Sequence, residues 1–259
     1  MSGPILVFDS GIGGLSVMNE IRKQLPQHDY CYLFDNARLP YGNLSEQELI
    51  AGCVALITHH ARRVNASIVV VACNTASTLV LPLLRQQLTI PIVGVVPAIK
   101  PAAMLSKKKH IGLLATPGTV KRDYTQALIN QFAGNCKVEL FGTSDLVLLA
   151  EQHVARQQID RNKLNDILFP IAASNIDVLV LGCTHFPMIA SEISYYLGGG
   201  VTLLDSGEAV AKRVRFLLSR DNDGSKQLQA CYTKDISEGL KATLVDYGFG
   251  DFSLVTITD

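Results

Sequence analysis

The chain has 259 residues, of which 48% are hydrophobic and 18% charged; this composition excludes a disordered chain and allows one or two globular domains. Lys and Arg (23) balance Asp and Glu (23), so the chain has no basic excess, and neither nucleic acid nor an anionic membrane is expected as a partner. Six cysteines without a close C-x-x-C pair predict free thiols and a reducing compartment rather than a disulfide framework.

Neither a secretory leader nor a membrane span is expected. Residues 1–8 lack the basic region and the long apolar region of a signal peptide. The longest uncharged window, 64–84, is interrupted by asparagine, serine, threonine and proline, which makes it too polar to span a bilayer. We therefore expect a soluble protein of the cytoplasm.

Short apolar runs alternate along the chain with longer amphipathic segments. The runs predict strands at 5–8, 30–34, 68–72, 92–95, 111–115, 138–141, 178–182 and 201–204. Their branched, nearly continuous apolar character is typical of parallel strands covered on both faces. Amphipathic patterns predict helices at 15–25, 45–64, 124–132 and 208–218. This alternation predicts a doubly wound α/β fold.

The two halves of this pattern resemble each other. Residues 5–11 are similar to 112–118, residues 32–34 to 139–141, and residues 69–75 to 179–185, at offsets of 107, 107 and 110. We therefore expect two similar doubly wound parallel-sheet domains related by pseudo-twofold symmetry, with the active site in the cleft between them. Prolines 97 and 101 and the sequence Asp205-Ser206-Gly207 mark the expected boundaries. The predicted domains are residues 1–97 plus 207–259, with the last segment returning to the first domain, and residues 98–206.

Cys73 and Cys183 follow equivalent strands of the two halves and precede helical patterns. Open parallel sheets place ligands beyond the carboxyl ends of their strands, and a helix N-terminus favours the thiolate form of a cysteine. The alternative is that both are buried core cysteines, but their equivalent positions favour a function. Two like bases suit a reaction that removes a proton from one face of a carbon and returns one to the other.

Other candidate residues surround these two thiols in the pattern. Residues 8–14, Phe-Asp-Ser-Gly-Ile-Gly-Gly, form a strand end and a Gly-rich turn in which Asp9 and Ser10 either cap a helix or face the cleft. The turn is not a dinucleotide fingerprint, because Ser16 stands where the third glycine is needed. His185, two residues after Cys183, is a candidate acid/base group.

No metal site is expected from the sequence. Cys73, Cys183 and His185 lack a fourth ligand nearby and the paired spacing of a zinc site. His59 and His60 fall within a helical pattern and are predicted to lie on the surface. The remaining cysteines are predicted to pack in the core: Cys31, Cys53, Cys136 and Cys231.

Four motifs in order resemble the signatures of the glutamate racemase family, in the aspartate/glutamate racemase superfamily. They are Asp9-Ser-Gly-Ile-Gly-Gly-Leu-Ser, Pro40-Tyr-Gly42, Ala72-Cys-Asn-Thr-Ala76 and Gly182-Cys-Thr-His-Phe-Pro187. Residues 94–101 and 114–122 also look like that family. The likeness extends from about residue 5 to residue 206, and residues from Arg220 onward carry little of it.

The resemblance implies a cofactor-independent isomerase that interconverts L- and D-glutamate and supplies D-glutamate for peptidoglycan synthesis. It implies that Cys73 and Cys183 are the acid/base pair, that Asp9 assists Cys73, and that His185 and Glu151 assist Cys183. The residues implied to bind substrate are Asp9, Ser10, Pro40, Tyr41, Gly42, Asn74, Thr75, Thr116, Thr119, Thr184 and His185. The expected partner is the small-molecule substrate, glutamate, and a homodimer is left open.

Three other functions compete with this one. A racemase of the same superfamily could act on aspartate or another amino acid. A two-domain binding protein without turnover would not need a cysteine at both strand ends. A thiol-redox or metal protein would be expected to show paired cysteine spacings, which this sequence lacks.

Overall fold

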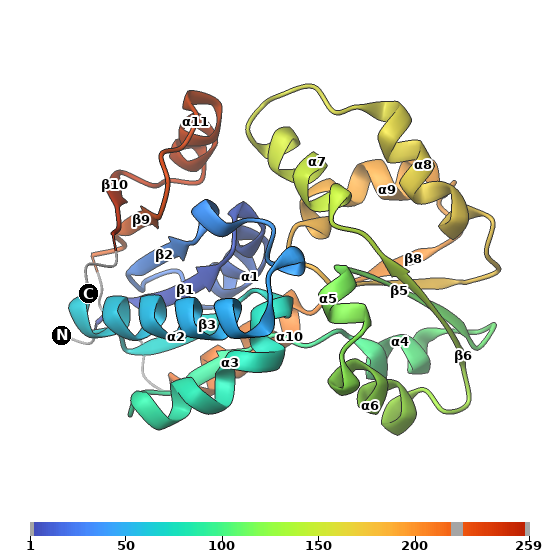
Figure 1. Ribbon diagram of the computed structural model, residues 1–259, viewed down its shortest axis with the longest axis horizontal. Coiled ribbons are helices and arrows are strands. Elements are labelled where there is room, and N and C mark those ends of the chain that lie inside the picture. The colour runs from blue at the N-terminus through green and yellow to red at the C-terminus, as the bar shows by residue number, and fades with distance from the viewer. Residues whose placement is uncertain (1–2, 219–224, 257–259) are drawn as a thin grey trace.

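The computed structural model describes residues 3–218 and 225–256, and it contains two parallel sheets that lie beside each other (Figure 1). The first sheet consists of β1 (Ile5–Asp9), β2 (Tyr30–Phe34), β3 (Ile68–Val71), β4 (Ile92–Gly94), β9 (Leu228–Tyr232) and β10 (Asp251–Leu254), in the order β10-β9-β2-β1-β3-β4. The second sheet consists of β5 (His110–Ala115), β6 (Lys137–Gly142), β7 (Val178–Leu181) and β8 (Thr202–Leu204), in the order β6-β5-β7-β8.

The strand order confirms the predicted fold class of two similar doubly wound α/β units. The order β2-β1-β3-β4 in the first sheet is repeated as β6-β5-β7-β8 in the second, and every strand pairing is parallel. The carboxyl ends of β3 and β7 are therefore equivalent positions in the two sheets, and the segments that carry Cys73 and Cys183 follow them directly.

Helices cover both faces of each sheet. The α-helices are α1 (Leu15–Gln24), α2 (Glu46–Arg63), α3 (Asn74–Gln87), α4 (Ile99–Leu105), α5 (Pro117–Val120), α6 (Asp123–Phe132), α7 (Asp145–Val154), α8 (Arg161–Ala172), α9 (Ala190–Tyr196), α10 (Gly207–Leu217) and α11 (Glu238–Asp246). Short 3₁₀ helices are η1 (Ile12–Gly14), η2 (Asn36–Arg38), η3 (Tyr41–Asn43) and η4 (Phe186–Ile189). The local sequence explains where several of these helices begin. Ser45, for example, forms a capping box with Glu48 at the start of α2.

Alternate residues of the central strands pack into two separate cores, one on each face of the sheet. The sequence of each such strand is therefore a continuous apolar run. Ile5 and Val7 of β1 pack with α1 and α10 on one face of the first sheet. Leu6 and Phe8 pack with α2 and α3 on the other. In the second sheet, α4 and α6 cover one face, while α7, α8 and α9 cover the other (Figure 1).

The C-terminal segment extends the first sheet. Strand β9 pairs with β2, β10 pairs with β9, and α10 packs against α1. This arrangement supports the predicted return of residues 207–259 to the first domain, although the domain boundaries stay a prediction. Within that segment, residues 219–224 and 257–259 lie outside the described residues, and so do Met1 and Ser2 at the other end.

One prediction about burial is half wrong. His59 is exposed, as expected, but His60 is completely buried. The two are neighbours on α2, so their side chains point about 100° apart, and His60 falls on the stripe that faces the sheet. Within the described ranges, no helix is long and apolar enough to cross a membrane.

Candidate active site

Cys73 and Cys183 line the same small cavity. Cys73 is the N-cap residue of α3, directly after β3, and Cys183 lies between β7 and η4. Both side chains are buried, with relative exposures of 5% and 7%. The fold therefore brings together two thiols that are 110 residues apart in the sequence, one from the end of each sheet.

Most of the predicted site residues line this cavity with the two thiols. The lining residues are Ser10, Pro40, Tyr41, Gly42, Cys73, Asn74, Thr75, Thr116, Val147, Cys183, Thr184 and His185. Asp9, Thr119 and Glu151 are not among them, but each is hydrogen-bonded to a residue that is. The sequence did not predict Val147, an apolar residue of α7 without a motif around it.

The surroundings of Cys73 favour its protonated form. Its thiol donates a long hydrogen bond to the Ser10 hydroxyl, with 3.8 Å between sulfur and oxygen. Burial raises the pKa of Cys73 well above its ordinary value, and the nearby Asp9 carboxylate raises it further. Both effects disfavour a thiolate at this position.

Asp9 is completely buried, and one of its oxygens has a partner from the second sheet. The Thr184 hydroxyl donates to Asp9 Oδ2 over 3.0 Å, whereas Oδ1 has no hydrogen-bond partner among the described residues. Burial raises the pKa of Asp9, although the charge of His185 acts in the opposite direction. A carboxyl group with a raised pKa beside the cavity is suited to exchanging a proton.

The surroundings of Cys183 contain a positive partner instead. His185 Nδ1 lies 3.7 Å from Cys183 Sγ, and its Nε2 lies 2.7 Å from Glu151 Oε1. Burial acts to lower the pKa of His185, but the hydrogen bonds to Cys183 and Glu151 outweigh it and hold that pKa well above the usual range. His185 therefore places a positive charge beside the Cys183 sulfur.

Three threonine hydroxyls form a compact cluster at the cavity. Thr75 Oγ1 lies 3.0 Å from Thr116 Oγ1 and 3.3 Å from Thr119 Oγ1, and the last two are 3.1 Å apart. Thr116 is also the N-cap of α5, where its side chain accepts a hydrogen bond from the Thr119 backbone N–H. Hydroxyls beside the N-termini of α3 and α5 can donate to a carboxylate, which the positive helix ends also favour.

The Gly-rich turn brings the first sheet's backbone against the Cys183 network. The backbone N–H of Ile12 donates to Glu151 Oε1 over 2.8 Å. A Cβ at Gly13 would lie 2.6 Å from His185 Nδ1, closer than real contacts allow. The glycine is therefore required for this close approach, and the capping role considered for this turn is not its main use.

Tyr41 connects the cavity to a polar group behind it. Its hydroxyl donates to Asp35 Oδ2 over 2.5 Å and accepts from the Cys53 thiol. The Leu39–Pro40 peptide bond, next to it, is cis. Asp35 was not predicted, because a lone aspartate after a strand carries no recognisable sequence signal. Only the turn that follows β2 brings it into contact with Tyr41.

The fold of the site has known counterparts. Residues 5–214 match the family model described as Asp/Glu/Hydantoin racemase. The chain is 92% identical, over the whole of both chains, to a curated protein named glutamate racemase from Shewanella frigidimarina. It is 65% identical to another of that name from Shewanella sp. strain ANA-3, over 99% of this chain and 98% of the relative.

A solved structure supports the same likeness in three dimensions. It is the crystal structure of Escherichia coli glutamate racemase in complex with L-glutamate and the activator UDP-MurNAc-ala. It superposes with a TM-score of 0.93 at 42% sequence identity, covering 99% of this chain and 100% of that one. The similarity thus includes the complete arrangement of both sheets.

Proposed function

Because this chain belongs to the Asp/Glu/hydantoin racemase family, we propose that it interconverts L- and D-glutamate without a cofactor, with Cys73 and Cys183 as the two bases. The observation that carries the proposal is that one small cavity is lined by a thiol from each sheet. A stereocentre held between them can lose a proton to one sulfur and receive one from the other.

Glutamate is the substrate that the relatives favour. The proteins 92% and 65% identical to this chain are both named for it, and the E. coli structure was solved with L-glutamate. The groups lining the cavity suit such a molecule, since the threonine cluster and the Asn74 amide can donate to carboxylates. Asp9 and Glu151 can balance an ammonium group.

The chemistry needs strong stabilisation, because the α-proton of an amino acid is only weakly acidic. Loss of that proton spreads negative charge onto the α-carboxylate, which becomes enolate-like. Fixed donors aimed at this carboxylate lower the barrier, and in a closed cavity they act without the reorganisation that water needs. Asn74 and Thr75 at the start of α3, together with Thr184 beside Cys183, are the candidate donors.

The proposed reaction starts with one sulfur as thiolate and the other as thiol. With Cys183 as thiolate beside His185 and Cys73 as thiol, Cys183 removes the α-proton of one enantiomer and Cys73 protonates the opposite face. The product then leaves a site in which the two states are exchanged. The other enantiomer reacts from that exchanged state, and its reaction restores the original protonation states of the two thiols. One turnover in each direction therefore leaves the enzyme unchanged.

Hydrogen exchange tests this proposal. Each enantiomer of glutamate is incubated with the purified chain in D₂O without added cofactor, and both the optical rotation and the deuterium at Cα are followed. Two-base racemisation is expected to place deuterium at Cα of the product formed in the first turnover. A product that keeps its protium, or the absence of any racemisation, contradicts the proposal.

The same assay with aspartate in place of glutamate separates the remaining alternatives. We expect racemisation of glutamate to be much faster. Faster turnover of aspartate would favour the other racemase of the superfamily, and binding of glutamate without exchange would favour a binding protein.

The wider role follows from the family resemblance. We propose that the product D-glutamate supplies peptidoglycan synthesis, and that the chain works in the cytoplasm, while a homodimer stays a prediction. Growth of a D-glutamate-requiring bacterium tests the role: expression of this chain is expected to remove the requirement, and the Cys73→Ala variant is not.

A further inference from the structure

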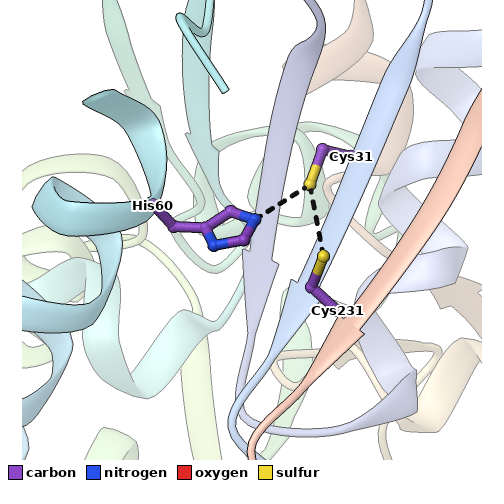
Figure 2. Close-up of side chains that lie close together, drawn as sticks. All are labelled: Cys31, His60 and Cys231. Atoms are coloured by element: carbon purple, nitrogen blue, oxygen red, sulfur yellow. Dashed lines mark hydrogen bonds between the residues drawn. The ribbon is translucent and has the colours of Figure 1, made fainter. Parts of the chain in front are cut away.

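A second group of thiols and imidazole lies inside the first sheet's domain, on the face covered by α2. Figure 2 shows Cys31 on β2, Cys231 on β9 and His60 on the last turn of α2, with their side chains pointing toward one another. In the register of β2 with β9, Cys231 is opposite Leu33, so Cys31, two residues earlier, has its side chain on the same face. None of the three lines the cavity that contains Cys73 and Cys183.

The spacing of the three ligand atoms matches that of a bound metal ion. Cys31 Sγ lies 3.3 Å from His60 Nε2 and 3.8 Å from Cys231 Sγ, and all the ligand atoms lie within 4.8 Å of one another. A tetrahedral zinc ion, with bonds of ~2.3 Å to sulfur and ~2.0 Å to nitrogen, holds two sulfurs about 3.8 Å apart and a sulfur and a nitrogen about 3.5 Å apart. An ion can therefore bind with little movement of the side chains.

Burial also favours an ion at this position. Cys31, His60 and Cys231 are each at most 1% exposed, and His60 Nδ1 has no hydrogen-bond partner in the described part of the chain. A buried imidazole with so few polar contacts is costly, and a bond from Nε2 to a metal would offset part of that cost. Among the described residues, this is the only group of three His, Cys, Asp or Glu side chains with metal-binding spacing.

Charge points to a divalent ion that prefers sulfur. Two thiolates and a neutral imidazole carry a charge of −2, which Zn²⁺ cancels, so the occupied site is neutral in an apolar core. Because cysteine binds a metal ion as thiolate, binding of the ion displaces the thiol protons of Cys31 and Cys231.

We propose that Cys31, His60 and Cys231 form a binding site for a thiophilic divalent metal ion, best matched by Zn²⁺, to which they supply three ligands. The site is separate from the racemase cavity and does not depend on the proposed function. It joins β9 of the C-terminal segment to β2 and α2, so an ion bound there would fasten that segment to the first sheet.

Cobalt titration tests this site, because Co²⁺ takes the place of Zn²⁺ and absorbs light when thiolates bind it. The full chain carrying Cys73→Ala and Cys183→Ala, which removes the cavity thiols, is reduced, freed of metal and titrated with Co²⁺. We expect thiolate-to-cobalt absorption that saturates at one equivalent and disappears on addition of Zn²⁺. In the same background, Cys31→Ala and Cys231→Ala are each expected to lose the saturable signal, and Cys136→Ala is expected to keep it.

Two further measurements keep the result interpretable if a cysteine variant does not fold. His60→Gln retains the thiols, and we expect it to weaken Co²⁺ binding at least about 100-fold, since it removes a ligand. Zn²⁺ is expected to raise the melting temperature of the background protein but not that of His60→Gln. Absence of saturable binding in the background protein, or an unchanged signal in His60→Gln or in both cysteine variants, would overturn the proposal.

Discussion

The surroundings of Cys73 and Cys183 differ, although the strands and turns that carry them are alike. Both cysteines follow the third strand of a repeated unit and precede a helical segment. Around Cys73 the polar neighbours are the Asp9 carboxylate and the Ser10 hydroxyl, and burial together with the Asp9 charge raises the pKa of the thiol. Around Cys183 the neighbour is the His185 imidazole, which Glu151 holds and whose pKa is well above the usual range.

This difference teaches that a duplicated fold supplies equivalent positions but not equivalent chemistry. A two-base racemase needs one base and one acid at the start of each turnover, and two identical surroundings would give both thiols the same protonation state. The residues that differ between the two halves, Asp9 and Ser10 on one side and His185 and Glu151 on the other, break that equivalence. Variants at and around the two cysteines test whether these residues cause the difference.

The largest effect is expected from removing either sulfur. Cys73→Ala and Cys183→Ala should each lower kcat for racemisation by at least about 10³-fold, since an acid/base group contributes roughly 10²–10⁴-fold and each sulfur acts in both directions. Circular dichroism of glutamate measures the rate. Cys136→Ala serves as the control, because Cys136 is partly buried against the core of the second sheet and does not line the cavity. Near-normal turnover in either active-site variant would remove that cysteine from the mechanism.

His185→Gln should sharpen the comparison, because it removes the positive partner from one side only. We expect kcat to fall about 100-fold and the pH–rate profile to shift, because the variant lacks the His185 imidazole, whose pKa is well above the usual range. A loss of kcat without a shift of the profile would indicate that His185 only shapes the cavity.

His185 should also make the free energy of unfolding depend on pH. The pKa of His185 in the folded chain lies above the unfolded value of ~6.5. The contribution of His185 to the free energy of unfolding is therefore fully present below pH ~6.5 and is lost as the pH rises through the folded pKa. The difference in unfolding free energy between wild type and His185→Gln should shrink from pH 6 to pH 9, by about 1.4 kcal/mol for each unit of the pKa increase. Denaturant unfolding at both pH values measures it; a constant difference would contradict the raised pKa.

Gly13→Ala should break the Cys183 network without removing any polar group. The added Cβ would lie 2.6 Å from both the backbone nitrogen and Nδ1 of His185, so the backbone and the ring must shift, and we expect kcat to fall about 10-fold because acid/base groups act only at hydrogen-bond reach. Gly134→Ala is the matched control, since its Cβ would meet only Asn130 O, at 3.6 Å. Equal activity of the two variants would show that the ring tolerates the shift.

The smallest effect is expected away from both sulfurs. Thr119→Val removes one hydroxyl of the threonine cluster, and the loss of about 1 kcal/mol of hydrogen bonding should raise KM for glutamate roughly fivefold with little change in kcat. Steady-state kinetics separate the two constants. A fall in kcat of the same size, with KM unchanged, would place Thr119 in the chemical step instead of in substrate binding.

Much of the fold could be predicted from local pattern. Eight of the strands follow apolar runs, because residues buried on both sides of a sheet must be apolar on both. The two missed strands, β9 and β10, contain polar residues such as Gln229 and Asp251 and lie at one edge of the first sheet. These polar residues interrupt the apolar pattern, so neither strand has a continuous apolar run in its sequence.

The candidate site was predicted unevenly for a similar reason. Residues next to a strand end, such as Cys73 and His185, carry a recognisable local signal. Val147 and Asp35 do not, because each enters the site only through the packing of a helix or turn. Burial of His60 was also mispredicted, since one position on an amphipathic helix separates an exposed side chain from one that faces the sheet.

The sequence by itself determined the repeated α/β plan, the motifs and the two cysteines at strand ends, because these depend on residues close together in the chain. Only the tertiary structure decided which groups meet: Asp9 with Thr184, Ile12 with Glu151, and Cys31 with His60 and Cys231. Contacts between segments up to 200 residues apart depend on how the helices and sheets pack, and no local pattern encodes that packing. The burial and the Asp9 charge that raise the pKa of Cys73, and the imidazole beside Cys183, both arise from that packing.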